Sequence, residues 1–149
     1  MSTFADDAVA LFQEGYYCSQ SVLAAYAPLY DLSPDLAYRI ASGFGSGMAR
    51  MGEVCGAVTG AMMVIGLHAG NTDAQDSASR DRTYGLVAEY VKRFKALHGA
   101  LHCRLLLGYE IGTPEGRQAA REAGLFDSLC PLLVSDSANI LADLLKVTV

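Results

Sequence analysis

The stretch GEVCGAVTGAMM (residues 52–63) decides the fold, because a cysteine stands at the start of a helix-forming segment of small residues. Residues 54–69 contain no Asp, Glu, Lys or Arg. They are too few for a membrane span, which needs roughly 20 apolar residues. We therefore predict a buried central helix, headed by Cys55 and rich in glycine and alanine.

Length and composition indicate a single folded domain and argue against some classes of partner. The 149 residues suit a single domain over residues 1–149, and a hydrophobic fraction of 52% indicates a folded core. The net charge of −5 argues against nucleic acid or an anionic membrane surface as a partner. The first residues, MSTFADDAVALF, lack the basic segment and long apolar run of a signal peptide, so we predict a cytoplasmic protein.

Local signals predict helices along the whole chain. Thr3, Ser33 and Thr113 are capping residues, and the last two precede a proline and an acid. Glycines follow the apolar stretches and predict helix ends. A long helix is expected from about Asp73 to His98, and its predicted core stripe consists of Leu86, Val87, Tyr90, Val91, Phe94 and Leu97. We predict one compact all-α domain of about seven or eight helices.

The four cysteines, Cys18, Cys55, Cys103 and Cys130, are far apart and form no CxxC pair. Each lies at or just before the start of a predicted helix. Free backbone N–H groups and the positive end of the helix dipole favour a thiolate there. Because cytosolic thiols are normally reduced, the four suggest redox chemistry or metal binding rather than structural disulfides. Burial as small, inert hydrophobic residues is the structural alternative.

The motif CGAVTG at residues 55–60 resembles the CGAxxG motif of the C_GCAxxG_C_C family, which is described as redox-active. Cys18 upstream and Cys103 and Cys130 downstream fall where that pattern has them, and CRLLLG at residues 103–108 is also similar. The resemblance covers nearly the whole chain. It implies that these four cysteines are the functional residues, and it assigns no reaction. Part of split-Soret cytochromes is similar too, and there such cysteines accompany an iron–sulfur centre.

Three functions follow from these cysteines. In the first, a thiol-based redox protein, Cys55 is the expected nucleophile because its small-residue helix leaves the most open approach, and Cys55→Ser abolishes redox cycling. The redox partner is unknown. In the second, the four thiolates hold an iron–sulfur cluster or Zn²⁺. In the third, the chain is a helical interaction module with inert cysteines.

Other residues have possible roles beside the cysteines. Gly56 and Gly60 share one helix face and predict close approach of a helix, a cofactor, a substrate or a second copy in a homodimer. The glycine-rich loop GFGSG (residues 43–47) is expected to be a turn near Cys55, since no strand precedes it. His102 and Glu53 are candidate neighbours of a reactive thiol.

Overall fold

Helices begin where the capping residues predict them. In the computed structural model, which describes residues 3–149, the side chains of Thr3, Ser33 and Thr113 accept backbone N–H groups at three helix starts. The helical segments are α1 (Phe4–Gln13), α2 (Cys18–Tyr26), η1 (Ala27–Tyr30), α3 (Pro34–Ala41), η2 (Ser42–Phe44), α4 (Gly45–Met48), α5 (Gly56–Ala69), α6 (Ser77–His98), α7 (Cys103–Leu107), α8 (Pro114–Glu122), α9 (Leu125–Ser128) and α10 (Cys130–Leu145). The prediction of one all-α domain is confirmed.

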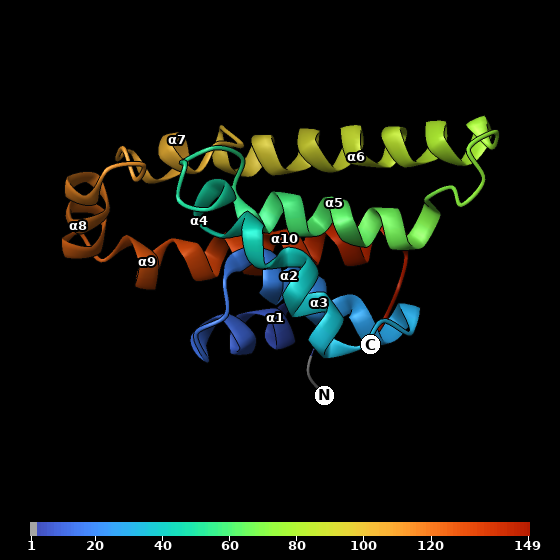
Figure 1. Cartoon of the computed structure of the whole chain (residues 1–149), viewed down its shortest axis with the longest axis horizontal. Helices are drawn as coiled ribbons and strands as arrows, with labels where there is room; N and C mark the ends of the chain where they lie inside the picture. The colour runs from blue at the N-terminus through green and yellow to red at the C-terminus, as the bar shows by residue number, and fades with distance from the viewer. Residues whose placement is uncertain (1–2) are drawn as a thin grey trace.

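Helix α5 is the centre of the packing. It lies among α2, α6 and α10, with α6 running along the outside of the molecule (Figure 1). Its glycines allow the closest of these contacts: a Cβ added at Gly60 would lie 2.8 Å from the backbone oxygen of Ser19 in α2. The small residues of the quoted stretch therefore let two helix backbones meet inside one chain.

Two parts of α6 differ from the prediction. The helix begins at Ser77 with Asp76 as its cap, because Asp73 first forms a turn in which its side chain accepts the Gln75 N–H. Leu97 was wrongly placed in the core, since it is 61% exposed. His98 faces inward instead, where its ring packs against Phe94 at an angle of 47° and its Nε2 hydrogen-bonds to Asp136 at 2.9 Å.

Buried hydroxyl groups fix the long helices around the start of α5. Tyr90 on α6 hydrogen-bonds to Ser137 on α10 at 2.7 Å, and the Ser137 hydroxyl donates to the Ala57 carbonyl at 2.8 Å. Such bonds are directional, and all their atoms lie in the core. Helices α6 and α10 therefore both fix the first turn of α5, whose N-cap is Cys55.

Among residues 3–149, one stretch, Leu125–Leu145, is long and apolar enough to cross a membrane by length and composition alone. It covers α9 and α10, and 44% of its most apolar window is buried inside the fold. The core helix of a soluble protein passes the same test, so the structure is consistent with a soluble protein. The cytoplasmic location stays a prediction.

Candidate functional site

All four cysteines line one pocket of about 310 Å³. Cys18, Cys103 and Cys130 are the first residues of α2, α7 and α10, and Cys55 is the N-cap of α5. The prediction that each cysteine begins a helix is therefore confirmed. All four are free thiols. The pocket lies where the N-terminal ends of these four helices come together.

A short antiparallel bridge places Cys55 and Cys103 together. Val54 pairs with His102, the Cys55 N–H donates to the Leu101 carbonyl at 2.8 Å, and the Cys103 N–H donates to Glu53 at 2.7 Å. Each cysteine follows a bridge residue, so both side chains leave the same face of this small ladder. Two helix starts that are distant in sequence thus become neighbours.

The glycine-rich loop forms the next wall as a left-handed turn. This turn comprises residues 46–50, which overlap the end of the loop and most of the short segment α4. All five residues have positive φ, and four of them are not glycine. Each such residue costs roughly 1–2 kcal/mol, and strain of this kind clusters at functional sites. Gly47 makes the close approach possible, because a Cβ there would lie 2.8 Å from Cβ of Cys103. The sequence predicted a turn near Cys55. In the structure the loop also lies directly against Cys103.

Cys18 and Cys130 shift each other's pKa values in opposite directions. A hydrogen bond from the Cys18 thiol to the Cys130 sulfur lowers the pKa of Cys130, although burial and the Asp127 carboxylate oppose this shift. The same hydrogen bond, followed by burial, raises the pKa of Cys18 well above its ordinary value. The proton of the pair therefore stays on Cys18, and Cys130 is the residue on which a thiolate forms first.

The other two cysteines are held as thiols. Burial raises the pKa of Cys55 to about 11, although the N–H groups of Ala57 and Val58 act in the opposite direction. Burial likewise raises the pKa of Cys103 to about 12. The expectation that Cys55 has the most open approach is wrong, because it is only 3% exposed whereas Cys18 is partly exposed. Helix starts alone do not activate these sulfurs once burial outweighs the helix dipole.

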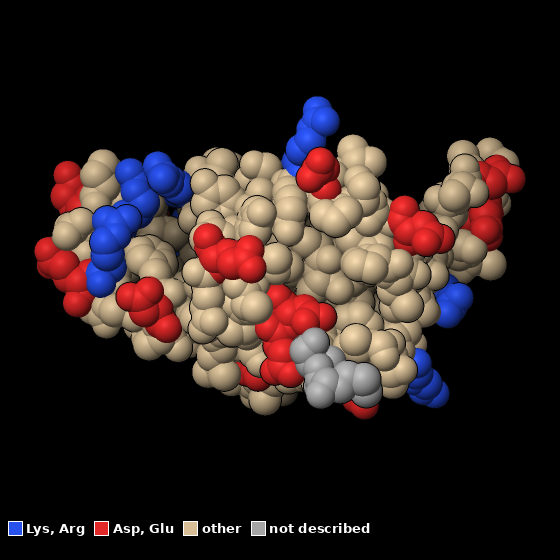
Figure 2. Space-filling view, turned by 90° about the horizontal axis from the view of Figure 1, so that it is seen from below, with Lys and Arg blue, Asp and Glu red and all other residues tan. Residues whose placement is uncertain are grey.

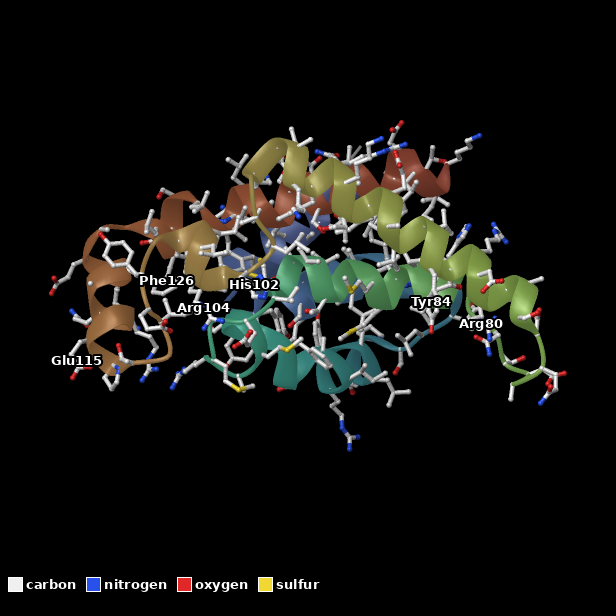
Figure 3. The ribbon with its side chains drawn as sticks, turned by 90° about the horizontal axis from the view of Figure 1, so that it is seen from above. Arg80, Tyr84, His102, Arg104, Glu115 and Phe126 are labelled. Atoms are coloured by element: carbon white, nitrogen blue, oxygen red, sulfur yellow. The ribbon has the colours of Figure 1, made fainter. Side chains whose placement is uncertain are left out.

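The remaining candidate residues are accounted for by packing and ion pairs. Gly56 lines the pocket, but a Cβ there would lie 2.9 Å from the Ser19 backbone nitrogen, so α2 occupies the Gly56 and Gly60 face. Glu53 pairs with Arg104 at 3.2 Å and lies 3.9 Å from His102. Arg104 and His102 lie close together beside the start of α7 (Figure 3). This cluster does not line the pocket.

Three arginines of the pocket were missed from the sequence. Arg50 comes from the left-handed turn, and Arg117 and Arg121 come from α8. The four-residue spacing of the latter two on one helix is a signal that could have indicated a common face. Arg50 carries no such signal, because its position depends on the unusual backbone of the loop.

The metal-binding alternative receives no geometric support for a single ion. Within residues 3–149, no three His, Cys, Asp or Glu side chains are arranged to hold a metal ion. An iron–sulfur cluster, which is larger than one ion, stays a prediction.

Fold and site together define a helical protein with a shared pocket of four free thiols. The chain belongs to the family described as "Putative redox-active protein (C_GCAxxG_C_C)", whose family model matches residues 16–144. The match includes all four cysteines. No curated protein and no solved structure matches this chain.

The thiol pKa shifts predict an order of alkylation. Near pH 8, iodoacetamide should modify Cys130 first, because its lowered pKa gives it the largest thiolate fraction. Cys55 and Cys103 should stay unreactive until the pH approaches about 11 and 12. Peptide mass spectrometry after timed quenching measures the order. In urea all four should react alike, and native labelling of Cys55 or Cys103 before Cys130 would contradict the assignment.

Proposed function

We propose that this protein performs thiol–disulfide exchange, with Cys130 as the attacking thiolate and Cys18 as the resolving thiol. The observation that carries the proposal is that Cys18 and Cys130 begin two helices on one pocket, and that their pKa values shift in opposite directions. A pair of titratable groups driven apart in this way divides the roles of base and acid between them. The family description, redox-active, agrees with this chemistry.

The reaction balances within the pair. The Cys130 thiolate attacks one sulfur of a disulfide, the substrate S–S bond breaks, and one thiolate leaves and takes a proton from solvent. Cys18 then loses its proton and attacks the Cys130 sulfur of the mixed disulfide. The second substrate thiol leaves, and a Cys18–Cys130 disulfide forms. Two electrons pass from the protein dithiol to the substrate, and the reverse reaction restores the dithiol.

Cys55 and Cys103 have a secondary place in this scheme. They line the same pocket and are held protonated by burial, so neither competes for the first attack. A thiol that lies in the same pocket can relay a disulfide from Cys18 and Cys130. Oxidation beyond the first pair is therefore expected to be slower.

The proposal is tested with the neutral reagent 2-hydroxyethyl disulfide. Reduced protein, desalted without oxygen, should release two thiols per chain in the first phase and lose two hydrogen atoms in mass. The released thiol and the intact mass measure both. A stable adduct of reagent and protein, with one thiol released, would contradict a resolving role for Cys18. The absence of reaction would contradict the exchange function.

A second candidate function is an electron carrier with an iron–sulfur cluster, favoured by the four thiols on one pocket. Cys18, Cys55, Cys103 and Cys130 would be its ligands, and a cluster supplies one-electron transfer. Anaerobically purified protein would then carry iron and acid-labile sulfide and absorb visible light. Protein with the mass of the bare chain would contradict this candidate.

A further inference from the structure

The charge of the thiol pocket is opposite to that of the whole chain. Three arginines line the pocket, Arg50, Arg117 and Arg121, and the lining drawn from residues 3–149 contains one acid, Asp127. The chain as a whole has a net charge of −5. Lys and Arg side chains lie side by side at the end of the molecule that carries α8, with Asp and Glu side chains around them (Figure 2). The lining of the thiol pocket therefore has more basic than acidic side chains, although the chain as a whole is acidic.

These arginines are not used in ion pairs. Arg93 and Arg104 pair with acids, whereas no carboxylate of residues 3–149 lies within 4.0 Å of the guanidinium groups of the pocket arginines. Arg117 donates to the Ile111 carbonyl at 3.1 Å. Arg121 donates to the side-chain oxygen of Gln118, a neutral amide, at 3.1 Å and lies over the Phe126 ring at 5.9 Å. These contacts orient the two side chains and leave their charge uncompensated. Such a guanidinium is suited to bind a carboxylate or phosphate.

The left-handed turn holds the third arginine at the junction of two hollows. Arg50 lines the thiol pocket and also a neighbouring hollow of about 240 Å³, and Tyr17 and Ser46 are shared in the same way. The thiol pocket, with its volume of about 310 Å³, is of a size that suits a small molecule. Apolar side chains form much of the rest of the thiol pocket, among them Phe12, Leu106, Leu107, Phe126 and Leu133. The site therefore combines a cationic part with an apolar lining beside the sulfurs.

We propose that the substrate is a small anionic disulfide, whose carboxylates or phosphates bind Arg50, Arg117 and Arg121 while its sulfurs reach Cys130. This inference rests on the proposed exchange function and adds the substrate class. Thiolate attack is as described above: the substrate gains two electrons and leaves as two anionic thiols, and Cys18 and Cys130 become a disulfide.

The test compares disulfides of different charge on the full chain. Glutathione disulfide offers carboxylates, coenzyme A disulfide offers phosphates, 2-hydroxyethyl disulfide is neutral, and cystamine is cationic. Wild-type protein should oxidise at least about tenfold faster with one of the anionic reagents than with the neutral one, and slowest with cystamine. The faster of the two anionic reagents identifies carboxylate or phosphate as the recognised group. Added salt should reduce the anionic advantage.

A matched pair of variants assigns the effect to the pocket. The double variant R50Q/R121Q should lose roughly 30- to 100-fold in rate with the preferred anionic reagent and about twofold or less with the neutral one. The control R80Q/R82Q makes the same change in net charge at the opposite end of the molecule, where Arg80 lies far from Phe126 (Figure 3). The control should keep the wild-type preference, and thermal unfolding shows whether each variant is folded.

Failure of this inference can be separated from failure of the exchange function. Equal wild-type rates with neutral and anionic reagents, or equal losses for both in R50Q/R121Q, would overturn the substrate class and leave exchange intact. If no reagent oxidises the protein, exchange fails. In that case, calorimetry measures the binding of S-methylglutathione and desulfo-coenzyme A, two anionic ligands that have no disulfide and cannot undergo exchange. At least one should bind wild type and lose affinity about tenfold or more in R50Q/R121Q, and no binding of either would overturn the inference.

Discussion

Cys130→Ser is expected to reduce the rate of reaction with a small disulfide by on the order of a thousandfold or more, because a serine hydroxyl supplies no thiolate at neutral pH. Cys130 has the lowered pKa of the thiol pair, and the other three thiols have raised values. Stopped-flow measurement of released thiol gives the rate. Cys130→Ala should show the same loss, which separates chemistry from any effect of the new hydroxyl.

Cys18→Ser should have a different outcome, and this difference identifies the two roles. The first attack by Cys130 still occurs, although more slowly, because the pKa-lowering hydrogen bond from the Cys18 thiol is changed. The mixed disulfide then has no resolving thiol beside it and should accumulate as a mass adduct on Cys130. Cys55→Ser should retain most of the wild-type rate. If Cys55→Ser instead abolished the reaction while Cys130→Ser did not, the assignment of the nucleophile would be wrong.

Gly60→Ala is expected to destabilise the fold by about 2–3 kcal/mol, as overpacking of a close-packed interface does. The added Cβ would lie 2.8 Å from the Ser19 oxygen and 3.2 Å from Cβ of Val22. The nearest of these atoms belongs to the backbone of α2, so relief requires the two helices to move apart. For a chain of this length, the expected fall in Tm is roughly 4–10 °C.

Gly66→Ala is the matched control on the same helix. A Cβ at Gly66 meets no atom within 4 Å outside its own helix, so the substitution should stabilise the protein by about 0.5–1 kcal/mol through the better helix propensity of alanine. Calorimetry or circular dichroism measures both unfolding transitions. Equal Tm values for the two variants would contradict the close approach of α2 and α5 at Gly60.

Much of the fold could be predicted because its signals are local. The capping side chains of Thr3, Ser33 and Thr113 bond to backbone groups within three residues, so sequence alone contains the whole interaction. The same holds for the cysteines at helix starts. Leu97 was misplaced because its side of α6 depends on which helices lie beside it, and the sequence does not contain that information.

The site could be predicted in part. That the four cysteines belong together followed from their shared position at helix starts and from the family resemblance. Which thiol is activated did not follow, because burial and the mutual effect of Cys18 and Cys130 on their pKa values involve segments that are far apart in the chain. Arg50 could not be predicted either, since its place in the pocket depends on the run of positive φ angles at residues 46–50.

The central claim, that Cys18 and Cys130 form the exchanging pair, is tested most directly by a peptide map of the oxidised protein. Reduced protein is treated with one equivalent of 2-hydroxyethyl disulfide, quenched in acid, alkylated and digested. We predict a linked pair of peptides containing Cys18 and Cys130, with alkylated Cys55 and Cys103. A link between Cys55 and Cys103, or four alkylated cysteines, would contradict the claim.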